Sequence, residues 1–195
     1  SKPLAQYLVN QQKRWSKRPE LFQKRMFENL IVQGRTTKFG EDHDFKHIRT
    51  IQDFQKNVPI RDYEGLSSYV DLIRKGESDV LWPGKPIYFA KTSGTTSGSK
   101  FIPITKSSIP NHINSARNAL LSYIMETKKS SFVDGNMIFL SGSPELDEEA
   151  GIPTGRLSGI VNHHVPDYLR RNQKPSYETN CIDDWEKKLD KIIEE

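Results

Sequence analysis

Cysteine and long apolar runs are both scarce in this sequence, and each scarcity excludes a class of protein. Cys181 is the only cysteine, so no disulfide framework can form, which is typical of a reducing compartment. No apolar run approaches the ~20 residues that a membrane-spanning helix needs, and the first residues lack the apolar core of a signal peptide. We therefore expect a cytoplasmic protein that does not act at a membrane.

Hydrophobic residues are also few, at 34% of the 195 residues, which is low for a self-sufficient core. The charge is unevenly placed, because residues 1–38 carry nine Lys/Arg and two Glu, a net charge of +7, while the remainder carries −3. A basic arm is typical of proteins that bind nucleic acid or anionic membranes. Here the basic residues sit in pairs within helical patterns. We interpret them as a solvated helix face and expect no nucleic-acid partner.

Two common nucleotide-binding signatures are missing as well. No G-x-G-x-x-G is present, so a dinucleotide-binding fold has no support. The pattern around Gly94, Gly98 and Lys100 is not a Walker loop either, because Lys100 does not follow Gly98 directly. What is present is a run of small hydroxylated residues between two apolar stretches. Residues 87–90 predict one short buried strand, and residues 101–104 predict the start of a second.

The run between these strands contains the groups that a polyphosphate needs. Glycines let backbone N–H groups turn toward one anion, hydroxyls add uncharged donors, and a terminal lysine supplies a mobile positive charge. A turn or a flexible connector is the alternative for such a loop, but a connector rarely lies between two strand-like runs with a lysine closing it. We predict a phosphate-binding loop made of Thr92, Ser93, Gly94, Thr95, Thr96, Ser97, Gly98, Ser99 and Lys100, with Lys100 as a catalytic residue.

This loop resembles the nucleotide loop of adenylate-forming enzymes, most of which end it with Gly-x-Pro-Lys. Here the last four residues are Ser97-Gly-Ser-Lys100, so the glycine has moved by one and the proline is gone. That departure resembles the acyl-acid amido synthetases, known from plants as auxin-responsive Gretchen Hagen proteins and also present in bacteria. Further resemblances cover nearly the whole chain, at residues 37–45, 58–64, 81–84, 100–103 and 155–159.

The resemblance implies a reaction in two steps, with ATP and Mg²⁺ as cofactors. A carboxylic acid attacks the α-phosphate of ATP to give an acyl-adenylate, and an amine, expected to be an amino acid, then takes the acyl group. An acyl-CoA ligase shares the first step and differs in the acceptor. A non-catalytic module that recruits a partner through its basic N-terminal arm is the third reading.

Helical periodicity dominates the first 80 residues. Apolar residues at helical spacing predict a hairpin of two helices, the second ending near Gly34 as its C′ residue. A short helix is expected to begin at Thr50, and a longer one covers residues 62–75 and ends at Gly76. Residues 107–128 predict the longest helix. Residues 183–195 predict a last amphipathic helix, which starts at Asp183 and is expected to be truncated.

The second half also contains candidates for the acid pocket. Residues 136–140 are apolar without alternation, which predicts a fully covered strand, and residues 141–144 end it where ligands sit in open α/β sheets. Ser158, within 151–159, is a possible substrate contact. Arg117 is either a surface cation or a partner for a carboxylate substrate. The acidic residues 145–149 are interpreted as a solvated charge run, and no protein metal site is predicted.

Taken together, these patterns predict an α/β fold in which the N-terminal helical hairpin packs on a mixed sheet. Residues 1–80 are expected to be mainly helical, and residues 81–180 to be α/β with the phosphate loop at 92–100. By its resemblance, the whole of 1–195 corresponds to the N-terminal portion of the large domain of an adenylate-forming enzyme. Because no adenine site or closing domain is recognisable, we expect this portion to be inactive alone.

Overall fold

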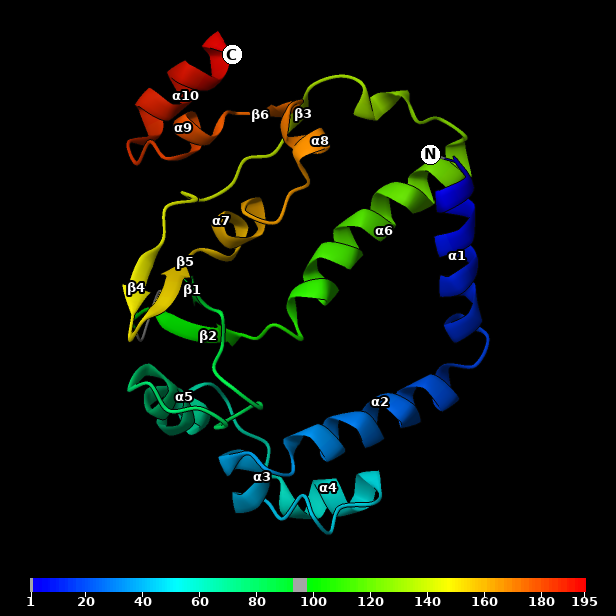
Figure 1. Cartoon of the computed structure of the whole chain (residues 1–195), viewed down its shortest axis with the longest axis vertical. Coiled ribbons are helices and arrows are strands. Elements are labelled where there is room, and N and C mark those ends of the chain that lie inside the picture. The colour runs from blue at the N-terminus through cyan, green and yellow to red at the C-terminus, as the bar shows by residue number, and fades with distance from the viewer. Residues whose placement is uncertain (1, 93–97) are drawn as a thin grey trace.

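The fold is organised around a β-hairpin, shown in the computed structural model in Figure 1, which describes residues 2–92 and 98–195. Its strands β1 (Tyr88–Thr92) and β2 (Lys100–Ile104) pair antiparallel from Tyr88 opposite Ile104 to Thr92 opposite Lys100. This register places the two ends of the predicted phosphate loop directly across from each other. Loop members 93–97 lie outside the described residues.

Two further strands extend the hairpin into a mixed sheet. Strand β5 (Ile152–Gly155) runs parallel to β1, and β4 (Asp147–Glu149) runs antiparallel to β5. The resulting strand order is β2-β1-β5-β4. The predicted α/β class with a mixed sheet is therefore confirmed.

Helices cover both faces of this sheet because successive strand residues point to opposite sides. On one face Phe89 is fully buried against Tyr69 and Ile73 of α5 (Ser67–Arg74). On the other face Ala90 packs with Ile160 of α7 (Leu157–Asn162). The alternation along β1 thus divides the core into two layers.

The N-terminal helices pack elsewhere than the sequence suggested. Helices α1 (Lys2–Ser16) and α2 (Pro19–Gly34) are present, but they diverge from their connecting turn (Figure 1). Ala5 of α1 packs against Leu121 and Ile124 of α6 (Ile109–Thr127), and Ile31 of α2 joins a separate cluster with Phe45. The expected packing of a hairpin on the sheet is corrected: Ala5 and Ile31 are buried by helix–helix and aromatic contacts, including an edge-to-face pair of Phe27 and Phe54, while most large apolar residues of α1 and α2 stay exposed.

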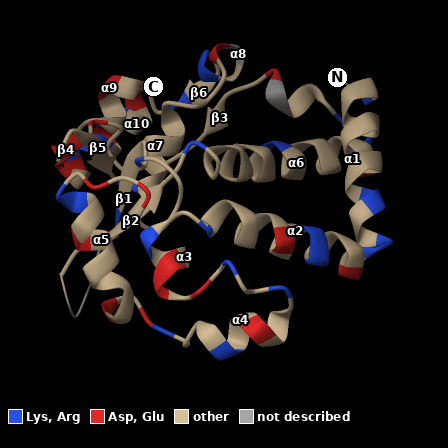
Figure 2. Cartoon of the chain, turned by 60° about the horizontal axis from the view of Figure 1, so that its bottom comes forward, with Lys and Arg blue, Asp and Glu red and all other residues tan. Residues whose placement is uncertain are grey.

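The remaining elements are short. They are α3 (Lys38–Asp42), α4 (Ile51–Asn57), the 3₁₀ turn η1 (Glu64–Leu66), the 3₁₀ turn η2 (Ser131–Val133), β3 (Met137–Ile138), α8 (Asp167–Arg170), β6 (Gln173–Lys174), α9 (Tyr177–Asn180) and α10 (Trp185–Glu194). Figure 2 shows that Lys and Arg are spread along α1 and α2, while Asp and Glu gather around β4 and β5. None of the described helices combines the length and the apolar character needed to span a bilayer.

The predicted strand at residues 136–140 differs from expectation. Strand β3 spans Met137–Ile138 alone and pairs parallel with β6 in a second, two-stranded sheet. Ile138 and Leu140 are 74% and 56% exposed, so the prediction of a fully covered strand is wrong for the described part of the chain. Apolar composition indicates that a strand can be buried, but burial itself needs a partner layer from elsewhere in the fold.

The ends of the helices are set by local hydrogen bonds and turns, and two of the predicted end residues are wrong. Thr50 closes a capping box with Asp53 at the start of α4, and Gly76, with φ +93°, ends α5 as predicted. Helix α10 is capped by Asp184 rather than Asp183, since the Asp184 carboxylate accepts the Lys187 N–H. Gly34 is not a left-handed C′ residue: it is the last residue of α2, and a Cβ there would come within 2.9 Å of the Phe45 ring.

The backbones of α7 and of the segment after β3 approach each other closely at Gly159, which explains why this position has no side chain. A Cβ at Gly159 would lie 2.2 Å from the Ser143 carbonyl oxygen. We expect Gly159→Ala to lower the free energy of unfolding by about 1–3 kcal/mol, because backbone rather than a flexible side chain must move. Urea denaturation measures this loss.

Gly135→Ala is the matched control, because a Cβ at Gly135 would have nothing within 4 Å and the φ of this glycine is not positive. Its denaturation midpoint should stay within experimental error of the parent sequence. Equal midpoints for the two variants would contradict the tight contact between α7 and Ser143.

Candidate functional site

A cavity of about 480 Å³ opens beside the ends of the β1–β2 hairpin. Four stretches of chain form it: the hairpin ends, the segment after β3, the end of β5 and the start of α10. Its lining residues are Lys91, Thr92, Ser99, Ser141, Gly142, Ser143, Glu145, Asp147, Thr154, Gly155, Arg156, Ile182, Asp183, Trp185 and Lys188. Two members of the predicted phosphate loop, Thr92 and Ser99, therefore face the same space as the segment after the apolar stretch 136–140.

The segment after β3 is held against α7 by backbone contacts. The Gly142 N–H donates a hydrogen bond of 2.9 Å to Ser158 Oγ, and His163 Nε2 lies 2.7 Å from the Pro144 carbonyl oxygen. Gly142 itself lies against Arg156, because a Cβ there would fall 2.6 Å from Arg156 Cδ. The Ser158 hydroxyl thus holds the backbone of the segment that lines the cavity.

Charge in the cavity is mixed. Lys91, Arg156 and Lys188 contribute cations, whereas the carboxylates are those of Glu145, Asp147 and Asp183. Lys188 is 7% exposed and donates a 2.7 Å hydrogen bond to the Asn180 carbonyl oxygen, which offsets part of the cost of burying an ammonium. Within the described residues, no three or more His, Cys, Asp or Glu side chains are arranged to hold a metal ion.

Lys100 points away from this cavity. Its Nζ lies 3.5 Å from Glu64 Oε1 and 5.0 Å from the centre of the Tyr63 ring. Ser99 lines the cavity, whereas the long Lys100 side chain extends to η1, although its cross-strand partner Thr92 also lines the cavity. Of the described loop members, Thr92 and Ser99 therefore line the cavity, while the Lys100 ammonium contacts Glu64 and Tyr63.

The other predicted or notable side chains lie in different surroundings. Arg117 is exposed on α6 and takes part in no hydrogen bond or ion pair within the described residues.

The thiol of Cys181 has a raised pKa. Burial is the main cause, and the nearby Glu145 carboxylate is the second. A raised pKa keeps the thiol protonated and unreactive, consistent with an ordinary cysteine.

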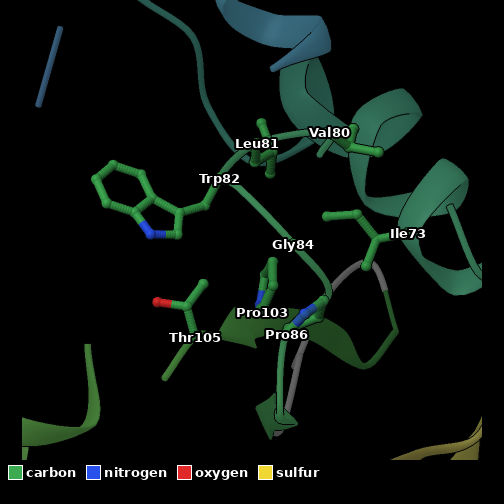
Figure 3. A pocket seen from close by; sticks show the side chains of 8 residues that line it. All are labelled: Ile73, Val80, Leu81, Trp82, Gly84, Pro86, Pro103 and Thr105. Atoms are coloured by element: carbon green, nitrogen blue, oxygen red, sulfur yellow. The ribbon is translucent and has the colours of Figure 1, made fainter. Parts of the chain in front are cut away.

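A second cavity, of about 220 Å³, lies at the opposite end of the hairpin (Figure 3). Its wall is mostly apolar and contains Ile73, Val80, Leu81, Trp82, Gly84, Pro86, Pro103 and Thr105. The hydroxyl of Thr105 already accepts the Ser108 N–H at 3.2 Å. This cavity thus lacks the convergent free polar groups that orient a reactive substrate.

Sequence reasoning missed several residues of the larger cavity. Arg156 lies within residues 151–159, a stretch already considered for the acid pocket, so the sequence did point to its region. Lys91 directly precedes the predicted loop and was not included in it. Lys188 gave no signal, because one lysine among the charges of an amphipathic helix looks like any solvated residue. Tyr63 and Glu64 belong to a stretch that carried the family resemblance without an assigned role.

Comparison with known proteins places the chain in the same family that its loop sequence resembles. Residues 8–190 match the GH3 family N-terminal domain. Indole-3-acetic acid-amido synthetase GH3.15 of Arabidopsis thaliana is 42% identical over 65 residues, which are 32% of this chain and 11% of that protein. Indole-3-acetic acid-amido synthetase GH3.4 of the same plant is 22% identical over 171 residues, or 85% of this chain and 28% of that protein.

Solved structures of GH3.15 acyl acid amido synthetase share the fold. One superposes with a TM-score of 0.71 at 18% identity, covering 92% of this chain and 31% of that chain. Another, a complex with 2,4-DB, gives a TM-score of 0.66 at 21% identity and covers 84% of this chain and 29% of that one. The chain spans about a third or less of the length of each of these relatives. Since the family match extends over nearly all 195 residues, the chain belongs to the GH3 family and contains its N-terminal domain region.

Proposed function

We propose that this chain is the phosphate-handling part of an ATP-dependent acyl-acid amido synthetase. The observation that carries the proposal is the position of the predicted loop within a member of the GH3 family: Thr92 and Ser99 open onto a cavity that also contains Lys91 and Arg156. Hydroxyls and cations around one space are the donors that a polyphosphate needs. The relatives named above are amido synthetases of indole-3-acetic acid or acyl acids, which supports the same reaction class here.

The proposed reaction adenylates a carboxylic acid and then transfers the acyl group to an amine, expected to be an amino acid. In the first step a carboxylate oxygen bonds to the α-phosphorus of ATP, and the bond to pyrophosphate breaks. ATP enters as its Mg²⁺ complex, in which phosphate oxygens hold the ion. The chain's residues supply donors and charge to the departing pyrophosphate, and groups arranged in advance for developing charge lower the barrier most.

Within this scheme Lys100 has the largest expected role of the loop residues. Its charge matters most as pyrophosphate leaves, when negative charge on the leaving group is greatest. In the full-length protein, we expect Lys100→Ala to lower kcat for ATP–pyrophosphate exchange by about 10- to 100-fold and to raise KM for ATP much less. Exchange is measured with ATP varied at saturating acid.

Lys106→Ala is the control for this experiment, since it removes a cation that is exposed shortly after β2. It should leave both kinetic constants unchanged. A folded Lys100→Ala protein with the parent kcat would show that the loop does not act on the phosphates.

Arg117 and Ser158 remain proposed contacts of the acid rather than of the nucleotide. Arg117 is exposed, so its guanidinium is free to reach a carboxylate, and such pairing is frequently bidentate. We expect Arg117→Ala to raise KM for the acid about tenfold and to spare KM for ATP. The exposed Arg25 of α2 gives a matched control, Arg25→Ala. An unchanged KM for the acid would return Arg117 to the role of a surface cation.

The identity of the acyl acceptor distinguishes an amido synthetase from an acyl-CoA ligase. We expect the full-length protein to form amides from amino acids and to leave coenzyme A unreacted, as the names of its relatives suggest. Product analysis by mass spectrometry, with one acid and either a panel of amino acids or coenzyme A, distinguishes them. Thioester formation without amide would support the acyl-CoA ligase instead, and absence of pyrophosphate exchange with every acid would favour a binding module.

A further inference from the structure

The ammonium of Lys100 already has a counter-ion in this structure. Glu64 Oε1 lies 3.5 Å from Lys100 Nζ, with the two side chains 57% and 35% exposed. The ring of Tyr63 lies on the ammonium as well, with its centre 5.0 Å from Nζ. An exposed carboxylate–lysine pair by itself is worth no more than about 1 kcal/mol, so this contact alone would not hold the lysine in one place.

Backbone contacts fix Glu64 relative to Lys100 independently of the ion pair. The Tyr63 hydroxyl accepts the Phe101 N–H at 2.8 Å and lies 3.4 Å from the Phe101 carbonyl oxygen. Tyr63 directly precedes Glu64, and Phe101 directly follows Lys100. The contact between the Tyr63 hydroxyl and the Phe101 backbone therefore aligns the turn η1 with the first residues of β2.

A second contact holds α5, which continues from η1, on the same strand. The Arg74 guanidinium lies 4.2 Å from the centre of the Phe101 ring and forms hydrogen bonds of 2.9 and 2.7 Å to Glu149 Oε1. Helix α5 is thus tied to both β2 and β4. Glu64 lies in η1, which leads directly into this tied helix, and its carboxylate lies beside Lys100, the last residue of the phosphate loop.

We propose that Glu64 is a positioning residue that holds the Lys100 ammonium until pyrophosphate oxygens replace the Glu64 carboxylate on it. This inference rests on the proposed function, because it needs Lys100 to engage the phosphates. The exchange is inexpensive, since an exposed ion pair is weak and a polyphosphate carries more charge than one carboxylate. Before the exchange, Glu64 keeps the mobile ammonium away from the carboxylates of the cavity, Glu145 and Asp147.

The proposal predicts a coupling between Glu64 and Lys100 that a purely structural residue would not show. In the full-length protein with magnesium pyrophosphate as the probe, we expect Glu64→Gln to tighten binding about two- to fivefold, because the competing carboxylate is gone. In a Lys100→Ala background the same substitution should change Kd by less than about 1.5-fold, since no ammonium remains to be released. Calorimetric titration of the four proteins completes the cycle.

Two variants control for charge and geometry. Glu77→Gln removes the same charge from an exposed side chain near the end of α5 and should leave Kd unchanged. Glu64→Asp restores the carboxylate and should return Kd to within about twofold of the parent. Equal thermal midpoints for all variants would show that the coupling is not an effect of folding.

The outcomes separate this inference from the function on which it rests. If Glu64→Gln leaves Kd unchanged, or changes it equally with and without Lys100, then Glu64 does not hold the ammonium and the inference is overturned. In that case a large effect of Lys100→Ala on exchange would still support the phosphate loop. If Lys100→Ala changes neither pyrophosphate binding nor exchange, the proposed function of the loop fails and the inference fails with it.

Discussion

The antiparallel pairing of β1 with β2 is the constraint on which the rest of this structure depends. Its register sets Thr92 across from Lys100, so the loop between them starts and ends at one edge of the sheet. The same register places Phe89 in the layer of α5 and Ala90 in the layer of α7. Shifting the pairing by one residue would reverse these two side chains and put a phenylalanine where the small Ala90 packs. The packing of the core layers and the positions of the two loop ends are therefore specified together.

The candidate site combines this hairpin with segments that are distant in sequence. Parallel pairing of β1 with β5 brings Arg156 to the hairpin end, and α7 holds the turn at Ser141 and Gly142 beside it. Glycines at the contacts allow this, since a side chain at Gly142 or Gly159 would overlap with Arg156 or the Ser143 backbone. The cavity owes its shape to close backbone approach as much as to the chemistry of its lining.

Lys100 illustrates how a long side chain can extend from the cavity side of the hairpin to the side of η1. Ser99 faces the cavity, while the Lys100 ammonium rests between Glu64 and Tyr63 on the side of η1. A lysine has a long stem with several rotatable bonds, so its charge can move between the two sides without movement of the strand. Because η1 holds the Lys100 side chain in a defined place, less side-chain entropy is lost when a ligand binds.

Local patterns in the sequence determined the helices at 2–16, 19–34 and 109–127, the two strands of the hairpin and the family to which the chain belongs. Such features depend on spacing and on near neighbours, which a sequence displays directly. Tertiary structure alone decided where α1 and α2 pack, why Gly34 lacks a side chain, and that Ile138 lies exposed in a second sheet. It also decided that Lys188 joins the cavity and that Glu64 meets Lys100. These outcomes are contacts between residues far apart along the chain, and no periodicity in either segment encodes its partner.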